Sequence, residues 1–352
     1  MFEKSLLFIF HAETPLHVGA GTAVSYVDLP IQREKHTSFP IMQASGVKGV
    51  IRDFAERRWK DGKKVDCIFG PENTERYFAS CISFTDAKIL LFPVRSLRGV
   101  FACLTCPFVL KRFIKDLKNA DIPCRLDFND IPIVEERNVF ITDDSLIKIE
   151  NNKIMIEEYD FEIMDKPINS KLKDTLEQFL PSSIIDFSKH FAIVHDNIFK
   201  DFVNLAIEIR TRIRIDQLKG IAKEGALFTE ELVPAEAVFY SLCFINDPYF
   251  GIKREVYKKI REKYYEPYKA KNDLNEGWEK LQKDKEIMKE IKENIHCTNI
   301  EEAFRNQYFT ASDIKEEICR IFGNNKKEDL LQFGGDETLG IGLMKVKIIE
   351  GR

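Results

Sequence analysis

The 352-residue sequence contains no apolar run long enough to cross a membrane, since a spanning helix needs about 20 consecutive apolar residues. Its N-terminal segment "MFEKSLLFIFHAE" has only a short apolar stretch, carries Glu3 and lacks a small-residue cleavage site. We therefore expect residues 5–12 to form a buried central strand and not part of a signal peptide. A composition that is 44% hydrophobic and 31% charged is typical of a soluble, cytoplasmic, globular protein with no membrane partner.

Paired cysteine motifs and common catalytic motifs are also lacking. The only close pair among eight cysteines is Cys103 and Cys106, and a lone CxxC without a nearby histidine is a weak indication of zinc. We expect reduced cysteines that fill apolar positions. The sequence has no GxSxG, HExxH or EF-hand pattern, and its glycine-rich segment "FGGDETLGIGL" is neither a GxGxxG nor a Walker loop. These absences exclude the corresponding hydrolase, calcium and nucleotide sites.

A net charge of −4 argues against non-specific binding to nucleic acid, although a local basic surface is still compatible with it. The segment "AIEIRTRIRID", residues 206–216, alternates apolar and charged side chains and predicts a strand. Its charged face holds Arg210, Arg212 and Arg214, spaced by about 6.6–6.8 Å, close to the separation of phosphates in single-stranded RNA. The alternative is that Glu208 and Asp216 pair with these arginines on a solvated sheet face. The glycines that follow predict a long loop or projecting hairpin.

The first 60 residues combine a glycine turn, a polar loop and a helix. "PLHVGAGTA" predicts a turn whose N–H groups point outward together, and the following loop contains an isolated acid, Asp28. "QASGVKGVIRDFAERRW" predicts a helix with Ser45 as its N-cap. Lys48 and Arg52 lie four residues apart and share a helix face, which indicates either a bound anion near the helix N-terminus or a solvated surface.

Residues 250–324 differ from the rest of the chain because they are dense in lysine and glutamate at spacings of three and four. This pattern is typical of solvent-exposed helices. We therefore predict an α+β protein with one domain formed by residues 1–249 and 325–352, and a charged helical insertion or subdomain at 250–324.

Five segments in order identify a family resemblance: "PLHVGAGTAVSYVDLPIQREKHTSFP", "VKGVIRDF", "FTDAKILLFPVRSLRGVFACLTCP", "TRIRIDQLKGIAKEGALFTEELVPAEAVFY" and "FGGDETLGIGL". The sequence resembles the repeat-associated mysterious protein (RAMP) superfamily, specifically the backbone subunit of the type III-B CRISPR effector, the Cmr complex. The resemblance implies an RRM-like, ferredoxin-like palm with a projecting thumb hairpin and helical fingers. It also implies a filament of copies along a CRISPR RNA, other Cmr complex subunits as partners, and cleavage of complementary target RNA at regular intervals.

The resemblance also assigns residues. It implies a metal-dependent endoribonuclease in which Asp28 binds Mg²⁺ or Mn²⁺ or activates the 2′-OH, with His17 as a supporting acid or orienting group. Glu230 is a further catalytic candidate from the thumb. Ser45, Lys48 and Arg52 are expected to hold the guide backbone, and Arg210, Arg212 and Arg214 to contact RNA.

Three positions depart from the family pattern. Gln43-Ala44-Ser45-Gly46 replaces the usual Pro-Gly-Ser-Ser lead-in, Ile341 replaces a base in the closing loop, and Leu232 replaces an aromatic. Two other functions are compatible with the residues: a non-catalytic subunit that binds the CRISPR RNA, and a nuclease that processes precursor RNA. The second usually needs a general acid/base pair on one monomer, whereas this sequence has filament-type segments.

Overall fold

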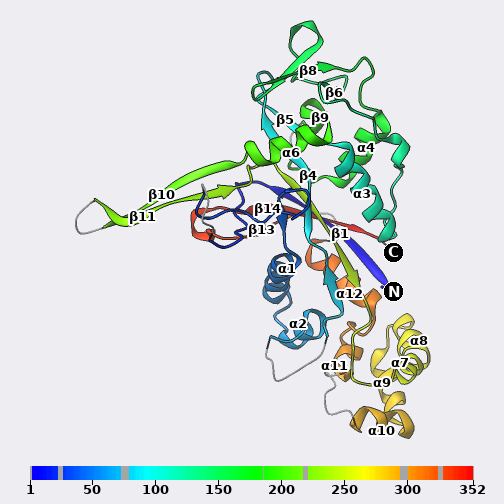
Figure 1. The fold of residues 1–352 in the computed structure, drawn as a ribbon. Helices are drawn as coiled ribbons and strands as arrows, with labels where there is room; N and C mark the ends of the chain where they lie inside the picture. Colours follow the sequence, from blue (N-terminus) through cyan, green and yellow to red (C-terminus); the bar gives the residue numbers. More distant parts are fainter. Residues whose placement is uncertain are drawn as a thin grey trace.

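The structure, a computed structural model, describes residues 2–22, 27–72, 79–184, 186–216, 221–293, 300–323 and 328–351, with the backbone alone at 214–216 and 221–226. It confirms the expected α+β class: a 12-stranded mixed sheet carries helices, and a separate two-stranded hairpin projects from the body (Figure 1). Within the described part of the chain, no helix is long and apolar enough to span a membrane.

The large sheet is built around strand β1 (Lys4–Ala12), which pairs antiparallel with β12 on one side and β14 on the other. Residues 5–12 are all buried, which confirms the predicted central strand. The sheet order is β13-β14-β1-β12-β4-β5-β9-β6-β8-β7, with β2 pairing β4 and β3 pairing β12. The other strands of this sheet are β2 (Ile41–Met42), β3 (Ile82–Phe84), β4 (Ala87–Arg95), β5 (Phe101–Thr105), β6 (Asn138–Ile141), β7 (Lys153–Ile156), β8 (Tyr159–Ile163), β9 (Phe191–Ile193), β12 (Val238–Ile245), β13 (Asp329–Gln332) and β14 (Leu343–Glu350).

Helices cover both faces of the central strands. Phe322, at the end of α12 (Ala311–Ile321), packs edge-on against Phe8 of β1 and also contacts Phe54 of α1 (Ala44–Trp59). Tyr240 of β12 is the neighbour of Ser241, which lies opposite Phe8 in the sheet, so the side chain of Tyr240 points to the other face. On that face Phe113 of α3 (Pro107–Asn119) packs against Tyr240. The remaining helices are α2 (Gly62–Phe69), α4 (Ser170–Phe179), α5 (Phe187–His190), α6 (Asp196–Leu205), α7 (Arg254–Ile260), α8 (Glu266–Ala270), α9 (Leu274–Gln282), α10 (Lys285–Glu293) and α11 (Ile300–Arg305).

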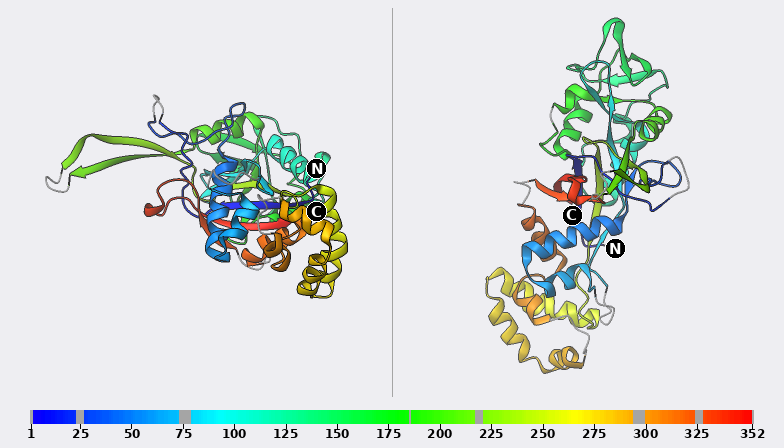
Figure 2. Two further views of the ribbon diagram at one scale, coloured as in Figure 1. Left: turned by 90° about the horizontal axis from the view of Figure 1, so that it is seen from below. Right: turned by 90° about the vertical axis from the view of Figure 1, so that its left-hand side faces the viewer.

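Helices α7–α11, within residues 254–293 and 300–305, lie at the end of the molecule opposite β6, β7 and β8 (Figures 1 and 2). Their lysine and glutamate side chains surround an aromatic core in which Tyr265, Trp278 and Phe309 all pack against Phe304. The next helix, α12, already packs against the central sheet. The division of the chain at residues 249 and 325 stays a prediction.

All seven described cysteines are unpaired, and six of them are buried. Cys103 lies in β5 and Cys106 directly precedes α3, and burial raises the pKa of both thiols. These two residues therefore contribute to the apolar core, as their positions in the sequence predicted.

Candidate nucleic-acid interface and cleavage site

The arginine-rich strand and its hairpin are present. Strand β10 (Glu208–Asp216) pairs antiparallel with β11 (Ile221–Leu232), and the two project together from the sheet (Figures 1 and 2). In this register Arg210 lies opposite Glu230, and Thr211 opposite Thr229. Strand alternation gives the hairpin two faces. One, the arginine face, carries Arg210, Arg212, Phe228 and Glu230, and the other, the threonine face, carries Ile209, Thr211, Thr229 and Glu231.

Two of the three predicted RNA-binding arginines are engaged within the chain. Arg210 Nε donates to Glu208 Oε1 at 2.6 Å. Arg212 Nη1 lies 2.8 Å from Glu230 Oε2 and 2.8 Å from Asp336 Oδ1. The bond to Asp336 is the main reason that the pKa of Arg212 is raised. The side chain of Arg214 lies outside the described residues. The intramolecular pairing considered as the alternative is therefore present at Arg210, whereas Arg212 pairs with acids that its own strand does not contain.

Asp28 lies on the outer edge of β11, the edge that does not face β10. Its Oδ2 accepts hydrogen bonds from Thr229 N at 2.7 Å and Thr229 Oγ1 at 3.0 Å, and Leu29 pairs with the backbone beside Glu230. The Thr229 amide bond is the largest cause of the lowered pKa of Asp28. The carboxylate is exposed, and no residue that the structure describes bonds to its Oδ1. Asp28 is thus an ionised group held in place through one oxygen.

The loop that carries Asp28 is anchored on three elements. Glu231 Oε2 accepts a bond from Ile31 N at 3.0 Å. Arg33 Nη1 donates to the carbonyl of Val203, in α6, at 3.0 Å, and Glu34 pairs with Arg112 of α3 at 2.7 Å. The charge-dense sequence that follows Asp28 therefore fastens the loop to α3, α6 and β11. These anchors were not predicted, because their partners lie more than 75 residues away in the sequence.

His17 is brought to the same strand edge as Asp28. Its Nδ1 lies 2.7 Å from the carbonyl oxygen of Glu231, so this nitrogen carries the proton and donates. The ring is 7% exposed. Its anchor on β11 lies two residues beyond Thr229, the anchor of Asp28, which is roughly 7 Å along a strand. The structure therefore anchors two of the three predicted catalytic residues two positions apart on one edge of the hairpin.

Glu230 is not part of that group. Its side chain leaves the arginine face of the hairpin, whereas the Thr229 hydroxyl that holds Asp28 lies on the threonine face. Glu230 is fully buried and bonded to Arg212, and its second oxygen, Oε1, has no partner. A direct role for Glu230 beside Asp28 is therefore not supported by its position. Period-two alternation along "TEEL" predicts that Thr229 and Glu230 lie on opposite faces, but only the structure shows that Asp28 is held by Thr229.

The helix predicted to hold the guide backbone differs from expectation at its start. The N-cap of α1 is Gln43 and not Ser45, and the carboxylate of Asp86 accepts a bond from Ala44 N at 2.8 Å. The anion near this helix N-terminus is thus a side chain of the protein. Ser45 lies exposed in the first turn. The prediction of Ser45 as the N-cap was wrong because an acid more than 40 residues away supplies the capping group.

The two cations of α1 that were predicted to hold the guide, Lys48 and Arg52, are not free on a surface. Arg52 bonds to Asp66 at 2.9 Å, to Glu72 at 3.1 Å and to the carbonyl oxygen of Gly70. Lys48 is half-buried beside the thiols of Cys81 and Cys243, and this burial lowers its pKa. No hydrogen bond or ion pair joins Lys48 to the described residues. Their roles in RNA binding stay predictions.

A glycine-lined cleft of about 490 Å³ separates the first glycine turn, the start of α1 and the closing loop. Its walls include Gly19, Gly46, Gly49, Gly334 and Gly335, together with Ser45. A Cβ added at Gly46 or Gly49 would meet no atom within 4 Å. In the first turn of α1, Ala44 N bonds to Asp86 and Val47 N to the Gln43 carbonyl. The N–H groups of Ser45 and Gly46 are therefore the donors that this helix start offers to an anion in the cleft.

The closing loop forms one wall of this cleft. Ile341, at the position where the family resemblance implied a base, is 3% exposed and belongs to the core. A charged side chain at this position would have to be buried. The loop therefore faces the cleft with backbone groups and glycines.

Asp28 is the residue of this site that could hold a metal ion together with the substrate. Among the described residues, no group of three or more histidine, cysteine, aspartate or glutamate side chains is placed to hold a metal. Asp28 offers one unengaged carboxylate oxygen. Mg²⁺ is commonly bound through one or two carboxylates together with substrate phosphates. The residues thus fit an ion shared between Asp28 and RNA, and do not fit a site closed by protein.

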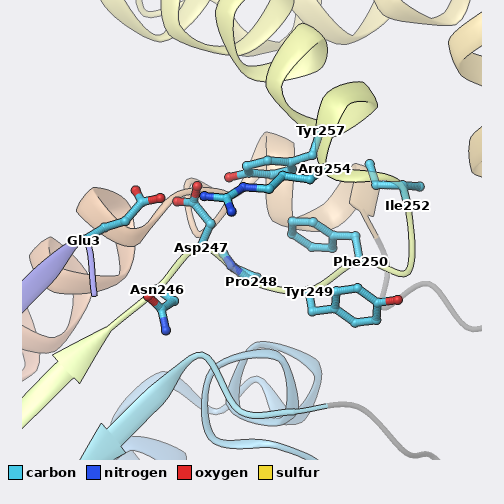
Figure 3. Close-up of a pocket in the computed structure, with 9 residues that line it drawn as sticks. All are labelled: Glu3, Asn246, Asp247, Pro248, Tyr249, Phe250, Ile252, Arg254 and Tyr257. Atoms are coloured by element: carbon cyan, nitrogen blue, oxygen red, sulfur yellow. The ribbon is translucent and has the colours of Figure 1, made fainter. Parts of the chain in front are cut away.

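Another cavity, of about 390 Å³, lies where β12 leads into α7 (Figure 3). Tyr249, Phe250 and Tyr257 line it, with Glu3 and Asp247 at one end. Asp247 accepts bonds from Arg261 at 3.0 Å and from the N–H of Ala311 at 2.8 Å. Its carboxylate therefore joins α12 to the helical end of the molecule, and this cavity is not assigned to the cleavage site.

Comparisons with known proteins agree with these features. The RAMP superfamily model matches residues 9–345. The chain is 37% identical over 275 residues, covering 74% of it and 90% of the relative, to the CRISPR system Cmr endoribonuclease Cmr4 of Pyrococcus furiosus. It is 28% identical over 258 residues to the CRISPR system CMR subunit Cmr4 of Saccharolobus solfataricus, covering 66% of this chain and 82% of that one.

Solved structures have the same fold. A crystal structure of oligomeric Cmr4 from Pyrococcus furiosus matches with a TM-score of 0.63 at 27% identity, covering 99% of this chain and 98% of the other. A cryo-EM structure of the type III-B Cmr-beta bound to cognate target RNA contains a chain that matches with a TM-score of 0.62 at 20% identity, covering 99% and 98%. The match to the RAMP superfamily model and the 37% identity to a Cmr4 protein show that this chain belongs to the RAMP superfamily and, within it, to the Cmr4 family.

Proposed function

We propose that this chain is the backbone subunit of a type III-B CRISPR effector that binds CRISPR RNA and cleaves complementary target RNA endonucleolytically. The observation that carries the proposal is the position of Asp28 and His17 on one edge of β11, at the base of a projecting hairpin. The 37% identical relative is a Cmr endoribonuclease. In this proposal the central sheet is the palm, β10 and β11 form the thumb, and α7–α11 form the fingers.

RNA supplies its own nucleophile, the 2′-OH, so the protein needs no serine or cysteine for the reaction. Cleavage requires the 2′-oxygen, the phosphorus and the leaving 5′-oxygen to lie in line, which an A-form duplex prevents. A thumb that enters the guide–target duplex and displaces a nucleotide removes that constraint at a cost of a few kcal/mol. Positioning of the released strand then provides much of the rate.

Asp28 acts as a fixed negative charge and not as a strong base. Its bonds to Thr229 lower its pKa, and a carboxylate with a reference pKa of about 3.9 is already a weak base at neutral pH. Its free oxygen is suited to accept a hydrogen bond from the 2′-OH. A Mg²⁺ or Mn²⁺ ion bound there would add charge stabilisation at the phosphate.

In this proposal His17 serves the other side of the reaction, at the leaving 5′-oxygen. Since Nδ1 donates to the Glu231 carbonyl, Nε2 is the ring nitrogen that remains for RNA. Protonated Nε2 would donate to the leaving 5′-oxygen, and neutral Nε2 would accept a hydrogen bond and orient the strand.

The guide is assigned to the glycine-lined cleft. Backbone N–H groups and Ser45 read phosphate and shape there, so that sequence is read by guide–target pairing. Further copies of this chain and the other Cmr complex subunits would extend the cleft along the CRISPR RNA, as the existence of an oligomeric relative supports.

The test assembles the complex on a CRISPR RNA and adds end-labelled complementary RNA with Mg²⁺ or Mn²⁺. A product ladder of regular spacing is expected, and Asp28→Ala should abolish it while target binding persists. Asp160→Ala, a change at an exposed aspartate on β8 that pairs with Lys153, serves as the control and should leave the ladder intact. Binding without cleavage by the unmodified chain would indicate a non-catalytic guide-binding subunit. Cleavage of precursor RNA by the isolated monomer would indicate a processing nuclease.

A further inference from the structure

His17 is fixed from two sides by two different parts of the chain. Its ring donates to the Glu231 carbonyl of β11 at 2.7 Å. Its own backbone carbonyl accepts a bond from Gly335 N, in the closing loop, at 2.9 Å. The orientation of the imidazole therefore depends on how β11 and the closing loop sit relative to each other.

The closing loop approaches His17 too closely to move independently of it. A Cβ at Gly334, where φ is +75°, would lie 2.1 Å from the backbone oxygen of His17. A Cβ at Gly335 would lie 3.6 Å from the ring. On the other side, a Cβ at Gly19 would lie 2.9 Å from Nε2. A displacement of the loop therefore displaces the histidine.

One side chain joins the two supports. Arg212 Nη1 bonds to Glu230 Oε2, next to Glu231 on β11, and to Asp336 Oδ1, next to Gly335 in the closing loop, each at 2.8 Å. The contacts form a closed circuit: from the His17 ring to β11, through Arg212 to the closing loop, and back to the His17 backbone. We call the ion-paired part of this circuit, Glu230–Arg212–Asp336, the clasp.

Arg212 cannot leave the clasp for RNA at a low energetic cost. Glu230 is fully buried, and Arg212 supplies its only side-chain partner among the described residues. A buried carboxylate that loses its partner is strongly destabilising. Arg212 also lies over the ring of Phe228, 5.6 Å from its centroid, which further fixes its direction.

We propose that Arg212 is a positioning residue for target cleavage: through the clasp it holds the closing loop, and through the loop it holds His17. This inference rests on the assignment of His17 to the cleavage site in the proposed function. It reassigns Arg212 from direct RNA contact, the role predicted from the sequence, to an internal one.

The test uses the assembled complex and the variant Asp336→Asn, which weakens the loop end of the clasp and leaves the buried Glu230–Arg212 pair intact. We expect kcat for target cleavage to fall about tenfold, since a small displacement of a catalytic group carries a cost of this order or more. KM and the affinity for target RNA should not change. Asp130→Asn is the matched control, because Asp130 is also mostly buried and paired with one cation, Lys171; it should not change kcat.

A double variant separates positioning from RNA contact. If Arg212 acts through His17, adding Asp336→Asn to His17→Ala should cause no further loss. Arg212→Lys, which keeps a cation between Glu230 and Asp336, should retain most of the rate of the unmodified chain. Two results would overturn the inference. One is a double variant whose kcat falls by the product of the losses in His17→Ala and Asp336→Asn, and the other is an Asp336→Asn variant that loses RNA affinity and keeps its kcat.

The cleavage rates of His17→Ala and Asp336→Asn distinguish a failure of the proposed role of His17 from a failure of the clasp inference. If His17→Ala cleaves at the rate of the unmodified chain, the role of His17 in the proposed function is wrong, and the clasp inference falls with it. If His17→Ala is slow and Asp336→Asn is not, the clasp inference alone is wrong.

Discussion

Asp28 binds Thr229 through a single carboxylate oxygen, which accepts both the backbone N–H, at 2.7 Å, and the hydroxyl, at 3.0 Å. The same threonine hydroxyl lies 3.1 Å from Asp28 N. This reciprocal contact joins a loop near the N-terminus to a hairpin 200 residues later. It fixes the direction of the other carboxylate oxygen, the one that the proposed reaction uses.

Replacing the hydroxyl of Thr229 should make the orientation of the Asp28 carboxylate less fixed while the acid itself stays in place. In Thr229→Val the backbone N–H still holds Asp28, but the hydroxyl bond is lost. We expect the single-turnover rate of target cleavage to fall by roughly tenfold, as expected for a misplaced reacting group, with RNA affinity unchanged. Thr211→Val, on the facing strand of the hairpin, is the matched control. Equal rates for Thr229→Val and the unmodified chain would show that the hydroxyl does not position Asp28.

The titration of Asp28 can be followed at the amide that holds it. Because the Thr229 bonds lower the pKa of Asp28 in the folded chain, the stability they contribute is present above the unfolded pKa of about 3.9 and is lost as the pH falls through the lower folded value. The Thr229 amide NMR signal should therefore titrate with a midpoint below the ordinary aspartate range. A midpoint above that range would contradict the geometry. Any acidic limb of the cleavage rate near pH 6 must then come from another group.

The fold was predictable from local patterns, whereas most of the site was not. The central strand, the arginine-rich hairpin and the exposed helices follow from hydrophobic periodicity over short windows. The partners of the charged residues come from distant segments: Asp86 caps α1, Asp336 pairs with Arg212, and Arg112 pairs with Glu34. Spacing in the sequence carries no information about these pairs. The positions of Asp28 and His17 were proposed from a family resemblance, and their shared strand edge became visible only in the structure.

The glycine-lined cleft gives a test of guide binding that does not involve the reaction. Gly46→Leu should fold, since its Cβ meets open space and leucine is the better helix former by up to about 1 kcal/mol. Its side chain would occupy the cleft. We expect affinity for the CRISPR RNA to fall at least about tenfold, or about 1.4 kcal/mol. Gly62→Leu, in the first turn of α2 and also open, should bind normally. Unchanged affinity in Gly46→Leu would place the guide elsewhere.

Helix α2 is joined to α12 by a buried ion pair. Lys64 bonds to Glu317 of α12, and its ammonium lies 4.7 Å from the centroid of Trp59. Lys64→Met removes the buried partner of Glu317 Oε2 and leaves that carboxylate paired with Arg320 alone, so it should lower the free energy of unfolding by about 1–3 kcal/mol. Lys63→Met removes an exposed pair with Glu302 and should cost at most about 1 kcal/mol. Chemical denaturation measures the free energy of unfolding of both variants. If Lys64→Met and Lys63→Met lower it equally, the Lys64–Glu317 pair does not stabilise the contact between α2 and α12.

The central claim is that Asp28 is required for cleavage and not for binding. Asp28→Asn keeps the shape of the side chain and removes its charge. The decisive measurement is the single-turnover cleavage rate and the bound fraction of the same labelled target RNA on the same assembled complex. The account predicts a rate that falls by at least about a hundredfold with the bound fraction unchanged. Cleavage at the unmodified rate, or loss of rate together with loss of binding, would contradict it.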